Sequence, residues 1–179
     1  SSTKNFKGTL GDIALITVGT PLKPDGNCDL SQVNKAVGWV LEHSENLNGI
    51  VMKSTVPPGT GIKLTEKVRS AKRPFYYSCP EFLSEGTALK DFLNPDRIIV
   101  GSEKTAPEHL IKNLHSGIKS HYLFTDTTTA EMIKCASNVF LSTKISLINS
   151  VANLCKKIEA NIDDVQKGVG RDPRIGQSY

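Results

Sequence analysis

Short apolar segments alternate with amphipathic segments over the first two thirds of the chain. The apolar segments are rich in β-branched or aromatic residues and end at proline, glycine or other turn formers, a pattern typical of β-strands. They span residues 13–18, 49–55, 75–78, 97–100 and 121–124. Apolar residues at helical spacing occur between them, at 29–41, 62–68 and 107–114. We expect Asp29 to cap the first of these helices. The alternation predicts βαβ units and a parallel sheet with helices on its faces.

The pattern changes in the last third of the chain. Thr128 and Glu131 have the spacing of a capping box, and no proline or glycine follows until after Ala160. This segment predicts a helix of about 30 residues, or about 45 Å at the α-helical rise. The centre of the helix is apolar on more than one face, so we expect another domain, a second subunit or both to cover it. A short further helix is predicted to begin at Ile162.

Composition and charge narrow the classes of protein to consider. The 179 residues are 38% hydrophobic and 22% charged, which is typical of globular proteins. The net charge is +4, but the 22 lysines and arginines are dispersed, so we expect no nucleic-acid partner. No apolar run approaches the roughly 18 residues of a membrane span, and residues 1–5 lack the apolar core of a secretory signal. The four cysteines form no CxxC pair, so we expect a cytoplasmic protein with reduced cysteines and no metal site.

Polar side chains follow three of the predicted strands. Thr20 comes after the first strand, Thr55 after the second, and Glu81 and Glu85 after the third. Ligands bind beyond the carboxyl ends of the strands in an open parallel sheet, so these side chains would converge on one binding rim. Each also has a simpler interpretation. A threonine beside a proline can merely shape a turn, and two glutamates four residues apart can merely share the exposed face of a helical turn.

Two further patterns concern the helices. Lys134 and Asn138 are four residues apart near the start of the long predicted helix, where an ammonium and a carboxamide could both donate to a developing oxyanion. A solvated polar stripe would have the same spacing. The Gly-Thr-Gly at 59–61 and the Gly-Val-Gly at 168–170 both lack the third glycine of a dinucleotide fingerprint. We therefore expect the first βαβ part of the nucleotide-binding domain to lie outside this chain.

Several sequence blocks, taken together and in this order, resemble the UDP-glucose/GDP-mannose dehydrogenase family. They lie at 18–21 with 29–30, at 53–60, at 80–86 with 94–98, at 130–145 and at 172–176. Each block alone is weak, but the ordered set is specific. The resemblance implies an α/β fold, with a partial Rossmann-like parallel sheet followed by the long central helix of an all-α dimerisation domain. It places the C-terminal part of an NAD-binding domain at 1–126 and the start of the central dimerisation domain at 127–179.

The resemblance also implies a reaction. The family oxidises the 6-hydroxyl of a nucleotide sugar with NAD, through an aldehyde and a cysteine thioester, and we expect UDP-glucose to be converted to UDP-glucuronate for polysaccharide biosynthesis. GDP-mannose or an N-acetylated UDP-sugar would also suit the family. The nucleophilic cysteine is expected beyond residue 179, so the chain alone is expected to be inactive. The long helix implies a homodimer, and no membrane partner is expected.

Nine residues match positions that in the family touch the cofactor, the sugar or the reacting atoms. The residues that match cofactor-binding positions are Thr20, Thr55 and Glu85. Catalytic roles correspond to Thr55, Glu81, Lys134 and Asn138, and substrate-binding roles to Phe82, Leu83, Lys134, Asn138 and Arg174. Among them, Glu81 is similar to the general base that activates water, and Lys134 to the cation that stabilises negative charge on the sugar oxygen.

Two alternatives remain open on the sequence. Dehydrogenases of the 3-hydroxyacid or 6-phosphogluconate type also place Lys-x-x-x-Asn on a helix after a Rossmann domain, although they lack the Pro-Glu-Phe-Leu block found here at 80–83 and the Lys-Ser-Thr-Val-Pro block at 53–57. The second alternative is a non-catalytic assembly fragment. Flanking glycine-rich and cysteine-containing segments in the native protein would distinguish an enzyme from such a fragment.

Overall fold

The computed structural model describes residues 11–44, 46–70 and 74–176. The chain divides into two compact units, residues 1–135 and 136–179, which are described separately. Residues 1–5, which we examined for a secretory signal, lie outside the described part of the chain. No helix in the described ranges is long and apolar enough to cross a membrane.

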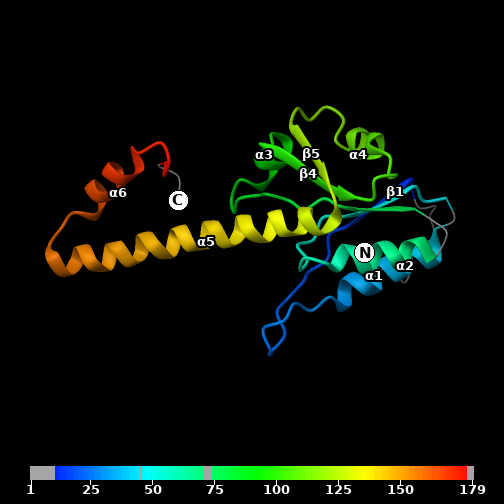
Figure 1. Cartoon of the computed structure of the whole chain (residues 1–179), viewed down its shortest axis with the longest axis horizontal. Coiled ribbons are helices and arrows are strands. Elements are labelled where there is room, and N and C mark those ends of the chain that lie inside the picture. Colours follow the sequence, from blue (N-terminus) through cyan, green and yellow to red (C-terminus); the bar gives the residue numbers. More distant parts are fainter. Residues whose placement is uncertain (1–10, 45, 71–73, 177–179) are drawn as a thin grey trace. The chain divides into compact units, whose positions relative to one another are not determined.

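The first unit is built on a five-stranded sheet with the spatial order β1-β2-β3-β4-β5 (Figure 1). The strands are β1 (Ile13–Ile16), β2 (Gly49–Met52), β3 (Phe75–Ser78), β4 (Arg97–Ser102) and β5 (His121–Thr125). All five predicted strands and the Rossmann-like α/β class are therefore confirmed.

The direction of one strand differs from the prediction. Strands β1, β2 and β3 run parallel, as do β4 and β5, but β4 runs antiparallel to β3. The prediction of a wholly parallel sheet is wrong at this pair. A parallel connection must carry the chain back to the starting edge of the sheet. Here the chain instead leaves β3 at Ser78 and re-enters the sheet from the same edge at Arg97, since Ser78 pairs with Gly101.

Six helices accompany the strands in the part of the chain that the structure describes. They are α1 (Ser31–His43), α2 (Thr60–Ser70), α3 (Ala88–Leu93), α4 (Glu108–Leu114), α5 (Thr127–Ile158) and α6 (Ile162–Gly170). All were predicted except α3, which is only six residues long and buries no side chain. The prediction of Asp29 as a cap is partly right. Leu30 occupies the N-cap position without a side-chain bond, whereas the Asp29 carboxylate accepts a hydrogen bond of 2.8 Å from the backbone N–H of Ser31.

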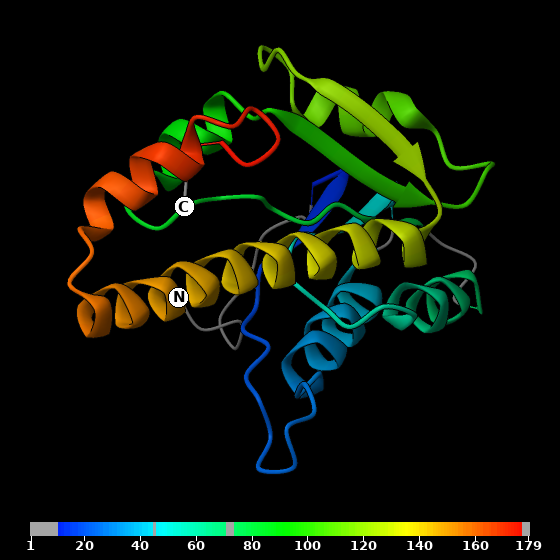
Figure 2. The same ribbon diagram turned by 60° about the vertical axis from the view of Figure 1, so that its left-hand side comes forward.

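The two faces of the sheet carry separate cores. Side chains alternate along each strand, so that neighbouring residues enter opposite cores. One core joins β1, β2 and Tyr76 of β3 to α1 and α2, and the other joins Val51, Tyr77 and β4 to Ile111 of α4. Helices α1 and α2 accordingly lie on one side of the sheet and α4 on the other (Figures 1 and 2).

The start of α5 docks closely on the first unit. The predicted capping box is wrong, because α5 begins at Thr127 and its first turn is capped by Asp126, which accepts hydrogen bonds of 2.9 and 2.6 Å from the N–H and hydroxyl of Thr129. Glu131, the other member of the predicted box, is instead only 2% exposed. Its two carboxylate oxygens accept hydrogen bonds of 2.7 Å each from the N–H groups of Gly59 and Gly61.

Two glycines allow this close approach. A Cβ atom added at Gly61 would lie 2.6 Å from the Cβ atom of Thr127 and 2.8 Å from a Glu131 oxygen. A Cβ atom added at Gly101 would lie 2.6 Å from the carbonyl oxygen of Asp126. Real Cβ atoms do not tolerate such contacts, so α2 and β4 can meet the first turn of α5 only where they carry no side chain.

The second unit comprises the rest of α5, the helix α6 and the turn that follows it. The Asn161 side chain caps α6 by accepting hydrogen bonds from the N–H groups of Asp163 and Asp164, and the Lys144 ammonium donates to the carbonyl of Ile175. Large apolar side chains of α5 are exposed along this unit, namely Val139, Phe140, Leu141, Ile145, Leu147, Leu154 and Ile158. Their burial in a homodimer stays a prediction.

Replacing Gly61 with alanine is expected to destabilise the first unit. The added methyl group would push α5 away from α2, and overpacking of this kind costs about 1–3 kcal/mol. Gly38 is a matched control in α1, because a Cβ atom there would lie 3.8 Å from its nearest neighbour, the Lys67 ammonium. Gly38→Ala should therefore stabilise by about 0.5–1 kcal/mol through helix propensity. Urea unfolding of the two variants measures both changes, and a neutral or stabilising Gly61→Ala would contradict the close packing.

Candidate functional site

The carboxyl ends of β1, β2 and β3 lie in one row. Their last residues are paired, Ile16 with Met52 and Met52 with Ser78, so the segments that follow leave the sheet at the same edge. The Thr20 hydroxyl donates a hydrogen bond of 2.9 Å to the carbonyl of Thr55. The structure thus brings together the two threonines that the sequence placed at this edge.

Lys53, Cys79 and Glu81 form a contact group beside these threonines. Lys53 directly follows β2 and Cys79 directly follows β3, and these two paired strands end side by side, so the segments that carry the three side chains leave the sheet together. The Lys53 ammonium lies 2.6 Å from a Glu81 carboxylate oxygen and 3.4 Å from the Cys79 sulfur. The side chain of Lys53 is only 8% exposed, whereas that of Glu81 is 30% exposed. Lys53 therefore belongs to the interior, and Glu81 reaches the surface.

The Cys79 thiol is a poor nucleophile in this setting. Cys79 is completely buried. Burial raises the pKa of its thiol, and the nearby Lys53 ammonium only partly opposes that effect. A thiol must lose its proton to attack a carbonyl carbon, so the geometry agrees with the interpretation that Cys79 is not the catalytic cysteine.

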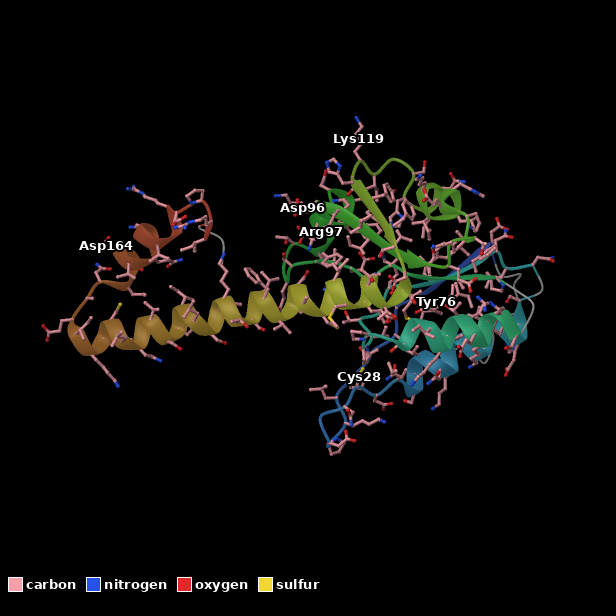
Figure 3. All side chains as sticks on the ribbon, in the orientation of Figure 1. Cys28, Tyr76, Asp96, Arg97, Lys119 and Asp164 are labelled. Atoms are coloured by element: carbon pink, nitrogen blue, oxygen red, sulfur yellow. The ribbon has the colours of Figure 1, made fainter. Side chains whose placement is uncertain are left out.

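Phe82 lies next to two cations. The Lys134 ammonium lies 5.1 Å from the centre of the Phe82 ring, and the Arg97 guanidinium 4.4 Å from it. Arg97 starts β4, where Figure 3 labels it. Continuing the antiparallel register of β3 and β4 past Ser78 and Gly101 leads from Arg97 toward position 82. The reversed strand therefore brings this arginine to the edge occupied by Glu81.

The electrostatic setting of Lys134 follows from its burial and its neighbours. Partial burial lowers the pKa of the Lys134 ammonium, the Glu81 carboxylate raises it in opposition, and the Arg97 cation lowers it further. The ring of Phe82, the residue after Glu81, contacts both the Lys134 ammonium and the Arg97 guanidinium, so these three charges share one region. Three of the first unit's candidates, Glu81, Phe82 and Lys134, thus lie together.

Glu85 and Leu83 are exposed and do not belong to the group formed by Glu81, Phe82 and Lys134. The backbone from 81 to 84 is not helical, and Glu85 lies in the turn that follows, so the prediction that Glu81 and Glu85 share a helical face is wrong. Leu83 is 40% exposed, and Glu85 is exposed as well.

Asn138 and Arg174 belong to the second unit. Asn138 follows Lys134 by four residues on the unbroken helix α5, and its side chain is exposed. Arg174 forms a two-pronged ion pair with Asp172, with nitrogen–oxygen distances of 3.0 and 2.6 Å. This local pair fixes the guanidinium relative to its own turn.

Three residues of the site region were missed as functional candidates. Lys53 could have been found, because a lysine two residues after a buried strand position points into the same core as that position. Arg97 could not have been found from the sequence, because its position beside Phe82 depends on the direction of β4. The burial of Glu131 was not predicted, because its spacing from Thr128 matches a capping box. That spacing indicated a partner within the same helix turn rather than Gly59 and Gly61.

Two models of one protein family match most of the chain. The family model for the NAD-binding domain of the UDP-glucose/GDP-mannose dehydrogenase family matches residues 2–119, and the model for the central domain of that family matches residues 128–179. Their descriptions also confirm the expectation of NAD as the cofactor.

Curated relatives match along nearly the whole chain. The UDP-glucose 6-dehydrogenase of Rickettsia conorii is 45% identical over 170 residues, which cover 94% of this chain and 39% of the relative. The UDP-glucose 6-dehydrogenase TuaD of Bacillus subtilis is 41% identical over 172 residues, which cover 94% of this chain and 37% of the relative. The chain therefore spans about two fifths of the length of these relatives.

Solved structures share the fold. A UDP-glucose dehydrogenase from Pyrobaculum islandicum superposes with a TM-score of 0.84 at 36% identity, covering 94% of this chain and 40% of that one. A GDP-mannose dehydrogenase from Pseudomonas aeruginosa superposes with a TM-score of 0.80 at 26% identity, covering 90% of this chain and 39% of that one.

The Lys134 ammonium is expected to titrate below the ordinary lysine value of 10.5, because burial disfavours its charged form. Glu81→Gln should lower this midpoint further, since the variant removes the carboxylate that favours the cation. NMR of protein with isotopically labelled lysine, assigned with a Lys134→Arg variant, measures the midpoint. Glu108→Gln is the control, because Glu108 pairs with Lys112 on α4 and should leave the midpoint of Lys134 unchanged. An upward shift in Glu81→Gln would contradict the described geometry.

Proposed function

The chain belongs to the UDP-glucose/GDP-mannose dehydrogenase family, and we propose that the complete protein uses NAD to oxidise the 6-hydroxyl of UDP-glucose to the carboxylate of UDP-glucuronate. One observation carries the proposal. The Lys134 ammonium lies over the ring of Phe82, the residue after Glu81, and Glu81 contacts Lys53, two residues before Thr55, whose carbonyl accepts a hydrogen bond from Thr20. A cation for a developing oxyanion and a base for water are two of the protein groups that this oxidation requires, beside the nucleophilic cysteine.

The residues present fit the nicotinamide end of NAD. In open α/β sheets a nucleotide lies beyond the carboxyl ends of the parallel strands, and here those ends carry the linked Thr20 and Thr55. These two residues would hold the nicotinamide and its ribose, with the exposed Glu85 beside them. When bound, NAD accepts a hydride in each of the two oxidation steps.

Lys134 would stabilise the sugar oxygen as negative charge develops on it. The ammonium is partly buried, and burial lowers its pKa. A partly desolvated cation interacts more strongly with an oxyanion than one in bulk water does, because the effective dielectric is lower. The amide of Asn138, one helical turn further along α5, would donate a second hydrogen bond.

Glu81 would act as the base in the last step. One of its oxygens contacts Lys53, and the side chain is 30% exposed, so the second oxygen is available to a water molecule. That water would attack the thioester carbonyl and give its proton to Glu81. The carbon–sulfur bond would then break, and the leaving thiolate would take up the proton from Glu81. Thr55 would help to hold the water. The nucleophilic cysteine of this step is none of the four in the chain.

The remaining candidates would bind the sugar nucleotide. Phe82 and Leu83 would line the sugar, and Arg174 would reach the sugar bound to the partner subunit. The exposed apolar side chains of α5 support a homodimer, since a long surface of this kind resembles an obligate interface rather than an ordinary exposed face.

NADH formation with three nucleotide sugars tests the proposed activity. In the complete protein, UDP-glucose should give two NADH per sugar and a higher kcat/KM than GDP-mannose or UDP-N-acetylmannosamine. The absorbance of NADH, together with quantification of the sugar acid, measures both. The absence of NADH with all three sugars would contradict the proposed activity, and a preference for another sugar would contradict only the proposed substrate.

Glu81→Gln in the complete protein should trap the covalent thioester, because the attacking water would lose its base. General bases of this kind contribute about 10²- to 10⁴-fold, so the steady-state rate should fall by that amount. Mass spectrometry of protein quenched during turnover should detect the adduct. Glu108→Gln on α4 serves as the charge-matched control and should turn over normally. Normal turnover without an adduct in Glu81→Gln would refute the role of Glu81.

A further inference from the structure

Lys53 has an unusual environment for a lysine. Its side chain is only 8% exposed, and it follows β2, whose four residues are all buried. Its backbone N–H donates a hydrogen bond of 2.9 Å to the carbonyl of Ile16, which continues the pairing of β1 with β2 past the last strand residue. The base of the side chain is therefore held by the most buried part of the sheet.

The backbone that carries the Glu81 carboxylate is less regular. Glu81 lies on the segment after β3, where residues 79–84 form neither helix nor strand. The N–H group of Cys79 still donates a hydrogen bond of 2.9 Å to the carbonyl of Met52, but Pro80 has no N–H to offer. Regular backbone structure thus stops short of Glu81, and the contact of 2.6 Å with the Lys53 ammonium ties the carboxylate to the sheet.

We propose that Lys53 is a positioning residue for Glu81. The ammonium binds one carboxylate oxygen and turns the other toward the water that the base activates. This inference rests on the proposed function, because it needs Glu81 to act as the base. Groups held on rigid elements keep a reacting atom in place more accurately than groups on loops, and a misplacement of about 1 Å can lower a rate by about 100-fold.

The surrounding charges cannot replace Lys53. Lys134 of α5 and Arg97 of β4 lie near Phe82, and the Lys134 ammonium would be engaged with the sugar oxygen. His115, at the end of α4, is buried, and burial lowers the pKa of its imidazole, with Lys53 lowering it further. His115 is therefore neutral near pH 7, and the neutral Cys79 thiol is only a weak hydrogen-bonding partner. The close cation contact to Glu81 comes from Lys53 alone among the residues described.

Lys53→Met in the complete protein tests the proposal, because methionine keeps most of the length of the side chain and removes the charge. We expect kcat to fall about 10- to 100-fold, while the KM values for NAD and UDP-glucose stay within about threefold of the wild type. The thioester adduct should accumulate during turnover, as in Glu81→Gln. A purely structural role of Lys53 would instead lower the first hydride transfer as well, and no adduct would build up.

A double variant provides the decisive measurement. If Lys53 acts through Glu81, Lys53→Met should lower the rate of the Glu81→Gln protein by less than about threefold, because residues that act as a unit are not additive. The double variant also removes both charges of the pair, so neither group is left without its partner. An additional loss as large as that in the wild-type background would overturn the proposal.

A control variant and the pattern of results distinguish failure of the positioning role from failure of the proposed function. Lys112→Met removes a lysine of similar length from the exposed ion pair with Glu108, and it should leave kcat and adduct levels unchanged. Full activity of Lys53→Met beside an impaired Glu81→Gln would overturn only the positioning role. Full activity of Glu81→Gln would refute the base itself, and the positioning role with it.

Discussion

The hydrogen bonds from Gly59 and Gly61 to the Glu131 carboxylate are the interaction on which the site depends. A buried carboxylate needs donors, and the first N–H groups of a helix lack partners within that helix, so α2 and Glu131 satisfy each other. Burial raises the pKa of Glu131, and the glycine N–H groups oppose this effect. The contact joins the first turns of α5 to the loop that carries Thr55. Lys134, one turn further along α5, thereby reaches Phe82.

The reversal of β4 is the second constraint. Because β4 enters the sheet from the edge where β3 ends, its first residue, Arg97, lies beside Phe82 instead of at the opposite edge. The region then holds three cations, Lys53, Lys134 and Arg97, around the carboxylate of Glu81. This excess of positive charge suits an anionic ligand, which agrees with a nucleotide sugar as the proposed substrate. The deeply placed Lys53 serves the carboxylate, whereas the other two cations lie nearer the ring of Phe82.

Much of the fold could be predicted from the sequence. The five strands, the helices α1, α2, α4 and α6, and the uninterrupted length of α5 follow from local periodicity and from the positions of proline and glycine. The meeting of Thr20 and Thr55 also follows, because parallel strands end at a common edge. The helix α3 escaped prediction, since it buries nothing. The capping box was misread, because its spacing is compatible with both a local and a distant partner for Glu131.

The sequence by itself determined the five strands and every described helix except α3, because the spacing of apolar residues within each segment indicates its type. Only the tertiary structure decided which distant side chains meet. Glu131 and Gly61 are 70 residues apart, Lys53 and Cys79 are 26 apart, and the neighbour of Phe82 depends on the direction of one strand. No local pattern records such pairs, because they arise from strand order and from the space left by glycines at the start of α5.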